Sequence, residues 1–350
     1  MKREQRKLDH IKYALELGDG TRQTRLEDVH FLHNCLTSVN PDKVDSSTRI
    51  GNLVLPFPVF IDAITGGTAK VKEINRNLAK VAKQAGVAMA VGSQYGAVKR
   101  DAFADTYDVV REENPDGIIF ANVSALASPE EAEKAVRMIR ADALEIHLNT
   151  AQELIMPEGD KHFAEIRRSL IRLQEAFSIP VIIKETGCGM AAEQIRELQA
   201  MGFTCFTIAG FGGTSFAAIE ASRNAKKRYA KFADWGIPTA WSLLDAVHQV
   251  RPWDTLIASG GIRSGWQAAQ ALAMGADAVG MSGNVLAVLM KQGVEAAVVC
   301  LQDIIDELKD IMVLTGSRTI RDLQRVPLIF TGKTMDFLQS RGYNGTFKRQ

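Results

Sequence analysis

The sequence predicts an α/β protein whose fold class is a (β/α)8 TIM barrel, with an N-terminal helical extension and a C-terminal helical tail. Eight short apolar segments follow one another along the 350 residues, and helical patterns separate them. Most of these segments are apolar throughout, which is typical of strands buried on both faces of a parallel sheet. Eight strand–helix units in order favour a closed barrel over a doubly wound sheet, which usually needs fewer strands.

The expected strands are evenly spaced, with one exception. Cys205 and Thr255 begin consecutive strands 50 residues apart, whereas the other strand starts lie closer together. The surplus follows the sixth strand, where a loop would cover the active-site face of a barrel. The eight expected strands are residues 58–63, 87–91, 117–123, 143–148, 180–185, 205–210, 255–260 and 278–283.

Helical spacing of apolar residues predicts the elements between and after the strands. The sequence from Ser128 to Glu131 is typical of a helix start, because it offers an N-cap, a proline at the first helical position and a capping-box glutamate. Gly86 and Gly202 follow two periodic segments and indicate where those helices end. Expected helices include residues 71–85, 163–177, 195–201 and 294–314. Residues 1–56 precede the first strand, and we expect them to form a helical extension of the same domain.

Composition excludes several classes of protein. The 42 basic and 41 acidic residues leave a formal net charge of +1, which argues against a chain built mainly to bind nucleic acid or an anionic membrane. The four cysteines are far apart and form no C-x-x-C motif, so a reduced, cytoplasmic setting fits better than a disulfide scaffold or a zinc site. The N-terminal residues lack the apolar stretch of a signal peptide, and no run of ~18 apolar residues could span a membrane.

Three Gly-Gly pairs suggest sites for phosphate groups. They are Gly66-Gly67, Gly212-Gly213 and Gly260-Gly261, and each follows an apolar segment. Backbone N–H groups at the starts of helices bind anions, and barrels often bind phosphate after strands seven and eight. SGGIRSG after the seventh strand and GMSGN after the eighth fit this pattern, and Thr214 can add a hydroxyl. Any single turn of this kind is weak evidence, because βα turns are rich in such residues.

Lys184 ends an apolar strand, and an interior lysine must be paired or functional because burying an unpaired charge is costly. One interpretation is a structural ion pair with Glu185 or Glu145. The other is a position beside N1 or a carbonyl oxygen of a flavin, where a cation would stabilise the anionic reduced ring.

The end of the fourth strand carries His147, Asn149, Gln152 and Glu153. These side chains can supply hydrogen bonds and one ligand for a hard metal, and a single carboxylate acting with phosphate oxygens and waters is the usual arrangement for Mg²⁺. Alternatively, His147 only satisfies a local hydrogen bond. Near the N-terminus, basic residues form either a solvated helix face or a clamp over a diphosphate; they are Arg3, Arg6, Lys7 and His10.

Several motifs run through the expected strand ends in a specific order. They are RKLDH (6–10), AITGG (63–67), GSQ (92–94), HLNTAQE (147–153), EGD (158–160), GGTSF (212–216), WGIPT (235–239) and ASGGIRSG (258–265). With these motifs the sequence resembles the type 2, FMN-dependent isopentenyl-diphosphate delta-isomerase family over nearly the whole chain. The resemblance implies an isomerase of isoprenoid biosynthesis that interconverts isopentenyl and dimethylallyl diphosphate and requires reduced FMN, NADPH as reductant and Mg²⁺. It also implies a cytoplasmic homotetramer or homo-octamer.

The resemblance implies roles for individual residues. Residues 1–56 would contribute to the substrate site, and residues 57–350 would form the FMN-binding barrel with its C-terminal helices. FMN would be held by Ala63, Ile64, Thr65, Ser93, Asn122, Lys184, Thr214, Gly260, Gly261, Ser282 and Gly283. Substrate would be held by Arg6, Lys7, His10, Ser93, Gln94, Tyr95, Asn149 and Gln152. The expected catalytic residues are Gln152, His147 and Glu153, and Glu153 would bind Mg²⁺.

Moving a double bond causes no net redox change, so we expect a flavin here to act as an acid–base group at N5, while Gln152 and Glu153 position the substrate. Three alternatives remain open. An FMN-dependent 2-hydroxy-acid oxidase needs a histidine base near the late strands, yet the last histidine, His248, lies in a helical pattern. A dehydrogenase with a covalent cysteine would have to use Cys188. The third alternative is a non-catalytic flavin-binding barrel.

Overall fold

Eight parallel strands close into a barrel, as the sequence predicts. The structure is a computed structural model that describes residues 9, 11–13, 16, 23–64, 66–99, 103–223 and 227–343. The barrel strands are β4 (Val59–Ile61), β5 (Met89–Ala90), β6 (Ile119–Ser124), β7 (Ala143–Leu148), β8 (Val181–Glu185), β9 (Cys205–Thr207), β10 (Thr255–Ser259) and β11 (Ala278–Met281). The last strand pairs with the first, Val279 opposite Val59, which closes the sheet.

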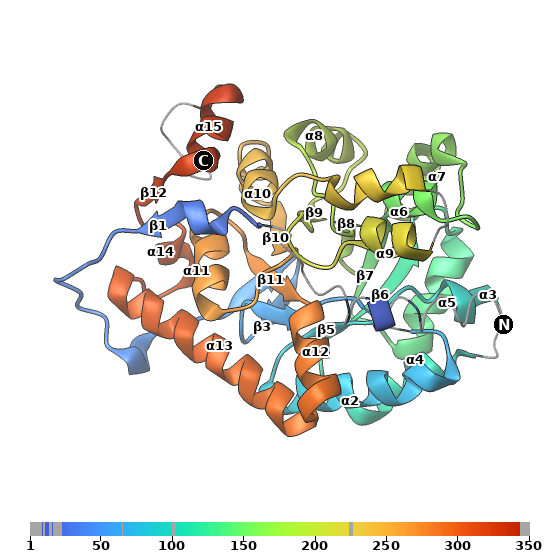
Figure 1. Cartoon of the computed structure of the whole chain (residues 1–350). Coiled ribbons are helices and arrows are strands. Elements are labelled where there is room, and N and C mark those ends of the chain that lie inside the picture. The colour runs from blue at the N-terminus through green and yellow to red at the C-terminus, as the bar shows by residue number, and fades with distance from the viewer. Residues whose placement is uncertain are drawn as a thin grey trace.

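Helices surround the barrel (Figure 1). They are α2 (Ala69–Ala85), α3 (Tyr95–Lys99), α4 (Asp105–Glu113), α5 (Pro129–Ile139), α6 (Thr150–Ile155), α7 (Ile166–Gln174), α8 (Ala192–Ala200), α9 (Phe216–Arg223), α10 (Thr239–Val247), α11 (Gly265–Ala273) and α12 (Gly283–Gln292). Short 3-10 segments η4 (Phe163–Glu165) and η5 (Lys227–Asp234) precede α7 and α10. The predicted capping box of Ser128 and Glu131 is present at the start of α5. Gly86 ends α2 in a left-handed conformation, as expected for a C-terminal cap.

The barrel interior changes from apolar to polar along the strands. The lower layer is apolar and contains Phe60, Phe120, Ala143, Ile182, Cys205 and Ile257. Because side chains two residues apart point to the same face of a strand, the next interior layer is set by the sequence. It consists of buried polar residues, Asp62, Asn122, Glu145, Lys184, Thr207 and Ser259. The chemistry is therefore concentrated at the carboxyl ends of the strands.

The expected helical extension is wrong for residues 23–56. This segment contains η1 (Leu26–Asp28), β1 (Val29–Phe31), η2 (Pro41–Lys43) and a hairpin of β2 (Thr48–Ile50) and β3 (Leu53–Leu55). Ile50 pairs with Leu53 across a two-residue turn in which Gly51 has a φ of 57°. Ile50 and Leu55 are fully buried against the lower layer of the barrel. The hairpin forms because its alternate apolar side chains close the amino-terminal end of the barrel.

The C-terminal tail is mostly helical, as predicted, with α13 (Val294–Thr315), α14 (Ile320–Leu323) and α15 (Gly332–Ser340). A short strand, β12 (Leu328–Phe330), interrupts it and pairs antiparallel with β1. Phe337 of α15 stacks on Trp241 of α10 with ring centroids 4.9 Å apart. The tail therefore attaches residues 25–31 to the outside of the barrel, as Figure 1 shows.

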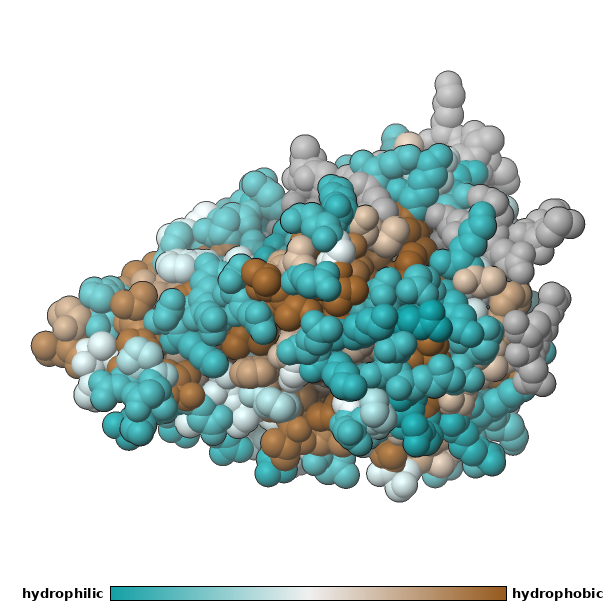
Figure 2. Space-filling model, turned by 90° about the horizontal axis from the view of Figure 1, so that it is seen from below, coloured by the Kyte–Doolittle hydropathy of each residue, from teal (hydrophilic) through white to brown (hydrophobic). Residues whose placement is uncertain are grey.

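One face of the molecule is covered mostly by hydrophilic residues, with separate hydrophobic patches between them (Figure 2). Within the described part of the chain, no helix is both long enough and apolar enough to cross a membrane.

Candidate active site

One cavity of about 260 Å³ lies at the carboxyl ends of the barrel strands. Residues from most of the strand ends line it, and many are the polar and glycine residues that the sequence predicts. Among the predicted residues, its lining includes Ala63, Ile64, Ser93, Tyr95, Asn122, His147, Asn149, Gln152, Glu153, Lys184, Thr214, Gly260, Gly261, Ser282 and Gly283. The structure thus brings together residues that are more than 200 positions apart in the sequence.

Five residues considered from the sequence lie outside the described part of the chain: Arg3, Arg6, Lys7, His10 and Thr65. Ile11, from the same N-terminal segment as the first four, lines the cavity. In addition, the guanidinium of Arg223 lies 3.5 Å from the Asp9 carboxylate. Asp9 and Ile11 are therefore close to the barrel mouth of their own chain.

Gln94 requires a correction, because its side chain does not face the cavity. It is fully buried, donates to the carbonyl of Ala135 at 2.9 Å and accepts from the amide of Asn122 at 2.9 Å. Its neighbour Ser93 lines the cavity instead. Gln94 therefore connects β6 to α5 and does not contact a ligand through its side chain.

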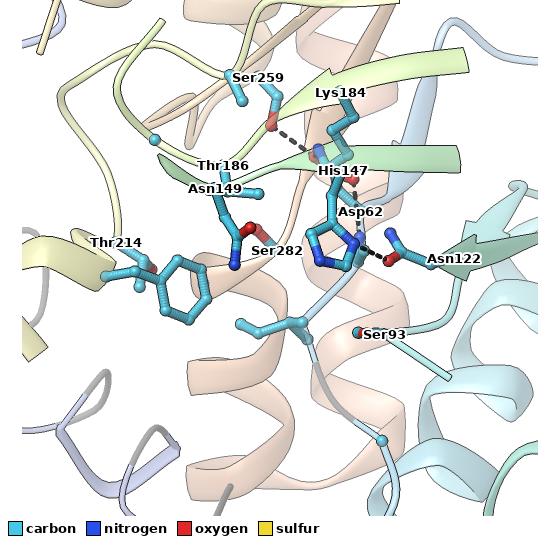
Figure 3. Close-up of a pocket in the computed structure, with 18 of the residues that line it drawn as sticks. Asp62, Ser93, Asn122, His147, Asn149, Lys184, Thr186, Thr214, Ser259 and Ser282 are labelled. Carbon is cyan, nitrogen blue, oxygen red and sulfur yellow. Dashed lines mark hydrogen bonds and ion pairs between the residues drawn. The ribbon is translucent and has the colours of Figure 1, made fainter. Parts of the chain in front are cut away.

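Lys184 is paired, but with neither of the two glutamates considered from the sequence. Its ammonium donates to Asp62 Oδ2 at 2.6 Å, and the Ser259 hydroxyl donates to the same oxygen at 2.6 Å, as Figure 3 shows. Burial opposes the charged form of Lys184, yet the attraction of the Asp62 carboxylate prevails and raises the pKa of the ammonium. The cavity floor therefore carries a fixed positive charge next to a carboxylate.

Glu185 holds the turn after β8. One of its carboxylate oxygens accepts hydrogen bonds from four consecutive backbone amides, those of residues 186–189. Burial raises the pKa of Glu185 to about 7, although these hydrogen bonds favour its ionised form. The carboxylate serves as a shared acceptor for this irregular turn, in which the amide of Gly189 also donates to the carbonyl of Ala209 at 3.0 Å.

A hydrogen-bonded chain links the barrel interior to His147. Asn122 donates its amide N–H to Glu145 Oε2 at 2.8 Å. Its carbonyl oxygen lies 2.8 Å from His147 Nδ1, the contact that Figure 3 marks between these two residues. With Glu145 as acceptor, the oxygen of Asn122 must accept from His147, so Nδ1 carries the proton and Nε2 is the acceptor nitrogen of the neutral ring. His147 is thus held in one tautomer at the cavity wall.

Glu145 is fully buried, and its Oε1 has no hydrogen-bond partner among the described residues. Burial raises the pKa of Glu145 to about 8, while the nearby charge of Lys184 acts in the opposite direction.

The start of α6 arranges three polar side chains along one wall. Asn149 donates to Gln152 Oε1 at 3.2 Å and to Glu153 Oε1 at 2.9 Å, while the amide of Asp160 donates to Glu153 Oε2 at 2.7 Å. The described residues contain no group of three or more His, Cys, Asp or Glu side chains that could hold a metal ion. A metal bound by Glu153 would therefore need oxygen ligands from a substrate and from water.

Two glycine turns and one serine turn form an anion-binding wall. Gly260 and Gly261 have φ values of 101° and 77°, which L side chains rarely adopt. Within the described part of the chain, no protein group accepts from the backbone amides of Gly261 or Ser282. Donors of this kind, in the turn before α11 and at the N-cap of α12, suit a phosphate group.

Sequence reasoning missed Asp62 as a lining residue, and it noted Ser259 and Arg263 only as part of the SGGIRSG segment, without roles of their own. Asp62 could have been found, since it stands two positions after an inward apolar residue, Phe60. Cys188 does not line the cavity, and burial raises the pKa of its thiol to about 12, so both its position and its chemistry disfavour a nucleophilic role there.

Comparison with known proteins defines the class of this barrel. Residues 114–329 match the FMN-dependent dehydrogenase family. The structure is similar to mandelate oxidase with (S)-2-phenylpropionate (TM-score 0.66, 18% identity, 92% of this chain and 94% of that chain). It is equally similar to mandelate oxidase with 3,3-difluoro-2-hydroxy-3-phenylpropionic acid (TM-score 0.67, 18% identity, 92% and 95% coverage). The protein is an FMN-dependent barrel enzyme by class.

Relatives with higher sequence identity identify the family within this class. The chain is 43% identical to the isopentenyl-diphosphate delta-isomerase of Geobacillus sp. over 98% of both chains. It is also 43% identical to that of Bacillus licheniformis (98% of this chain, 97% of the relative), and 38% identical to that of Listeria monocytogenes (95% and 92%). The chain belongs to the FMN-dependent, type 2 isopentenyl-diphosphate delta-isomerase family.

Proposed function

We propose that this protein interconverts isopentenyl diphosphate and dimethylallyl diphosphate in the cavity at the carboxyl end of its barrel. The observation that carries the proposal is the content of that one cavity. It combines an anion-binding wall, the buried Lys184–Asp62 pair and the polar row of His147, Asn149, Gln152 and Glu153. These are the groups that a flavin phosphate, a reduced flavin ring and a substrate diphosphate each require.

The residues of the cavity fit FMN. Backbone amides after β10 and β11, with the nearby Thr214 hydroxyl, would hold its phosphate. Lys184 is placed to balance the negative charge of a reduced ring, because its ammonium is fixed by Asp62 in the cavity floor. When bound, reduced FMN would supply the acid–base group for a reaction that has no net redox change.

The protein's own residues would bind and orient the substrate. Arg6 and Lys7 would pair with the diphosphate, and Glu153 would position Mg²⁺ against its oxygens. Gln152 and Asn149 would fix the substrate from α6, since their side chains are hydrogen-bonded to each other. Ile11, Met156 and Phe216 also line the cavity and would exclude water from the hydrocarbon part. Excluding water matters because the alkene is a poor base and the cationic centre must not be trapped by water.

His147 would act as a hydrogen-bond acceptor at Nε2. The chain of Glu145 and Asn122 holds a proton on Nδ1, so in the neutral ring Nε2 is the nitrogen that accepts. We also propose NADPH as the reductant and a homotetramer or homo-octamer as the assembly.

The direct test is an anaerobic assay with FMN, NADPH, Mg²⁺ and isopentenyl diphosphate, followed by detection of dimethylallyl diphosphate. Formation of this product supports the proposal. A yellow, FMN-loaded protein that never isomerises the substrate would identify a non-catalytic flavin-binding barrel. Turnover of 2-hydroxy acids without isomerisation would identify an oxidase.

A further inference from the structure

Thr239 is the first residue of α10 and stands where the long segment after β9 returns to the barrel. The amide of Phe211 donates to the carbonyl of Ile237 at 2.8 Å, and the amide of Thr239 donates to the carbonyl of Phe211 at 3.1 Å. Thr239 is fully buried and is absent from the lining of the cavity. It therefore lies behind the glycine turns and not among the groups that meet a ligand.

From this position Thr239 holds one peptide of the turn after β10. Its hydroxyl lies 2.5 Å from the carbonyl oxygen of Gly260 and 3.3 Å from that of Phe211. A hydroxyl has a single proton to donate, so the shorter contact, to Gly260, is the hydrogen bond. Arg263 holds two further peptides in the same way, since its guanidinium donates to the carbonyls of Gly261 at 2.5 Å and Gly212 at 2.7 Å.

These hydrogen bonds set the directions of three amides. The described chain contains no cis peptide, and in a trans peptide the C=O and the following N–H point in opposite directions. The hydrogen bond to the Gly260 carbonyl therefore fixes the direction of the Gly261 N–H. The bonds to the carbonyls of Gly261 and Gly212 fix, in the same way, the N–H groups of Ile262 and Gly213, respectively. All three residues line the cavity, and no described protein group accepts from their amides.

The turn needs such an external restraint because its residues are glycines. Gly260 and Gly261 lie at positive φ, and glycine crosses between backbone regions at little cost. If the Gly260 carbonyl lost its donor, the peptide could rotate and present an oxygen to the cavity in place of an N–H. A carbonyl oxygen repels an anion, so the rotation would weaken phosphate binding selectively.

We propose that Thr239 is a positioning residue for the phosphate group of the flavin. Its hydroxyl, together with the guanidinium of Arg263, locks the glycine peptides so that their N–H groups face the phosphate. This inference rests on the proposed function only in taking FMN as the ligand. Thr239 contacts neither the flavin ring nor the substrate in this role.

The test compares FMN with riboflavin, which lacks the phosphate, by titrating flavin-free protein and following the flavin fluorescence. Thr239→Val keeps the shape of the side chain and removes the hydroxyl. We expect the Kd for FMN to rise about 10-fold, the effect of losing one well-placed hydrogen bond, and the Kd for riboflavin to stay within about twofold. Thr239→Ser, which keeps the hydroxyl, should restore the preference for FMN.

Thr255→Val is the matched control, because this buried threonine lies at the opposite end of β10 and bonds the amide of Gly51. It should not change the ratio of the two affinities. Equal losses of FMN and riboflavin binding in Thr239→Val, or no loss of either, would overturn the inference. A wild-type protein with no preference for FMN over riboflavin would instead contradict the proposed function.

Discussion

At the scale of single residues, the site depends on where buried charges are paired. Lys184 and Asp62 neutralise each other at 2.6 Å, whereas Glu145 has one oxygen with no partner among the described residues. The pKa values follow from this difference. Lys184 keeps its charge because Asp62 touches it, and Glu145 tends to stay protonated because burial disfavours its ionised form.

This protonation gives a prediction for stability against pH. The pKa of Glu145 is raised from its usual 4.5 to about 8, so the folded state binds more protons than the unfolded state between these values. The contribution of Glu145 to the free energy of unfolding is complete below its unfolded pKa of 4.5. This contribution is lost as the pH rises towards 8, by at most about 1.4 kcal/mol per pH unit. Glu145→Gln cannot ionise and should therefore lose less stability than wild type between pH 6 and 8.

Urea unfolding of the flavin-free proteins at several pH values measures this difference. Glu185 also has a raised pKa, but it is present in both proteins and cancels in the comparison. Parallel pH dependences for wild type and Glu145→Gln would show that Glu145 is ionised throughout.

Glu153 carries a second prediction at this scale. Its carboxylate accepts from Asn149 and Asp160 at the cavity wall, where Gln would keep the size but lose the charge. If Glu153 positions Mg²⁺, Glu153→Gln should lower isomerase activity by roughly 100-fold or more, since such metal interactions are worth several kcal/mol. FMN should remain bound, as the absorbance spectrum would report. Simultaneous loss of the flavin would point to a structural role, and Glu165→Gln, at an exposed site, is the control.

At the scale of elements, the hairpin of β2 and β3 is expected to stabilise the barrel without taking part in the chemistry. Leu55 is fully buried at the amino-terminal end of the barrel, far along the strands from the cavity. Leu55→Ala should lower the free energy of unfolding by about 2–5 kcal/mol. Val54→Ala, in the same strand but 53% exposed, should change it by less than about 0.5 kcal/mol.

Denaturant unfolding measures both hairpin variants, and flavin titration of the folded fraction shows whether the site is affected. A large loss of FMN affinity in Leu55→Ala would contradict the separation between the apolar and polar layers.

The same elements show what could be predicted from the sequence. The eight strands were predictable because each is a continuous apolar segment buried on both faces, and all eight are present. The hairpin was not, because β2 and β3 have three residues each and are stabilised by a barrel end formed from distant parts of the chain. Gln94 was misassigned because adjacent residues of a turn point in different directions, so Ser93 and Tyr95 line the cavity and Gln94 does not.

The partners of the buried charged residues could not be predicted from the sequence either. Lys184 and Asp62 are 122 positions apart, and only barrel closure brings their strand ends together. Nearby glutamates in the chain were therefore the natural but wrong candidates. Glu145 instead bonds Asn122, and Glu185 caps its own turn.

At the scale of the whole molecule, a formal net charge of +1 coexists with a site suited to two anionic ligands. Local amides and single cations supply the attraction, so binding does not depend on an overall positive field. The C-terminal tail supports this arrangement. Thr334 of the tail donates to Asp28, in the segment before the barrel, and Arg341 of the tail donates to Asp245 of α10. The tail therefore connects that segment to the outer helices of the barrel.

If the barrel isomerises isopentenyl diphosphate as proposed, its flavin is not consumed by the reaction. The most direct measurement is the number of NADPH molecules oxidised per dimethylallyl diphosphate formed, under anaerobic conditions with FMN and Mg²⁺. We expect many product molecules to form for each NADPH, because reductant is needed only to reduce the flavin once. One NADPH oxidised per product, or no product at all, would contradict the proposed function.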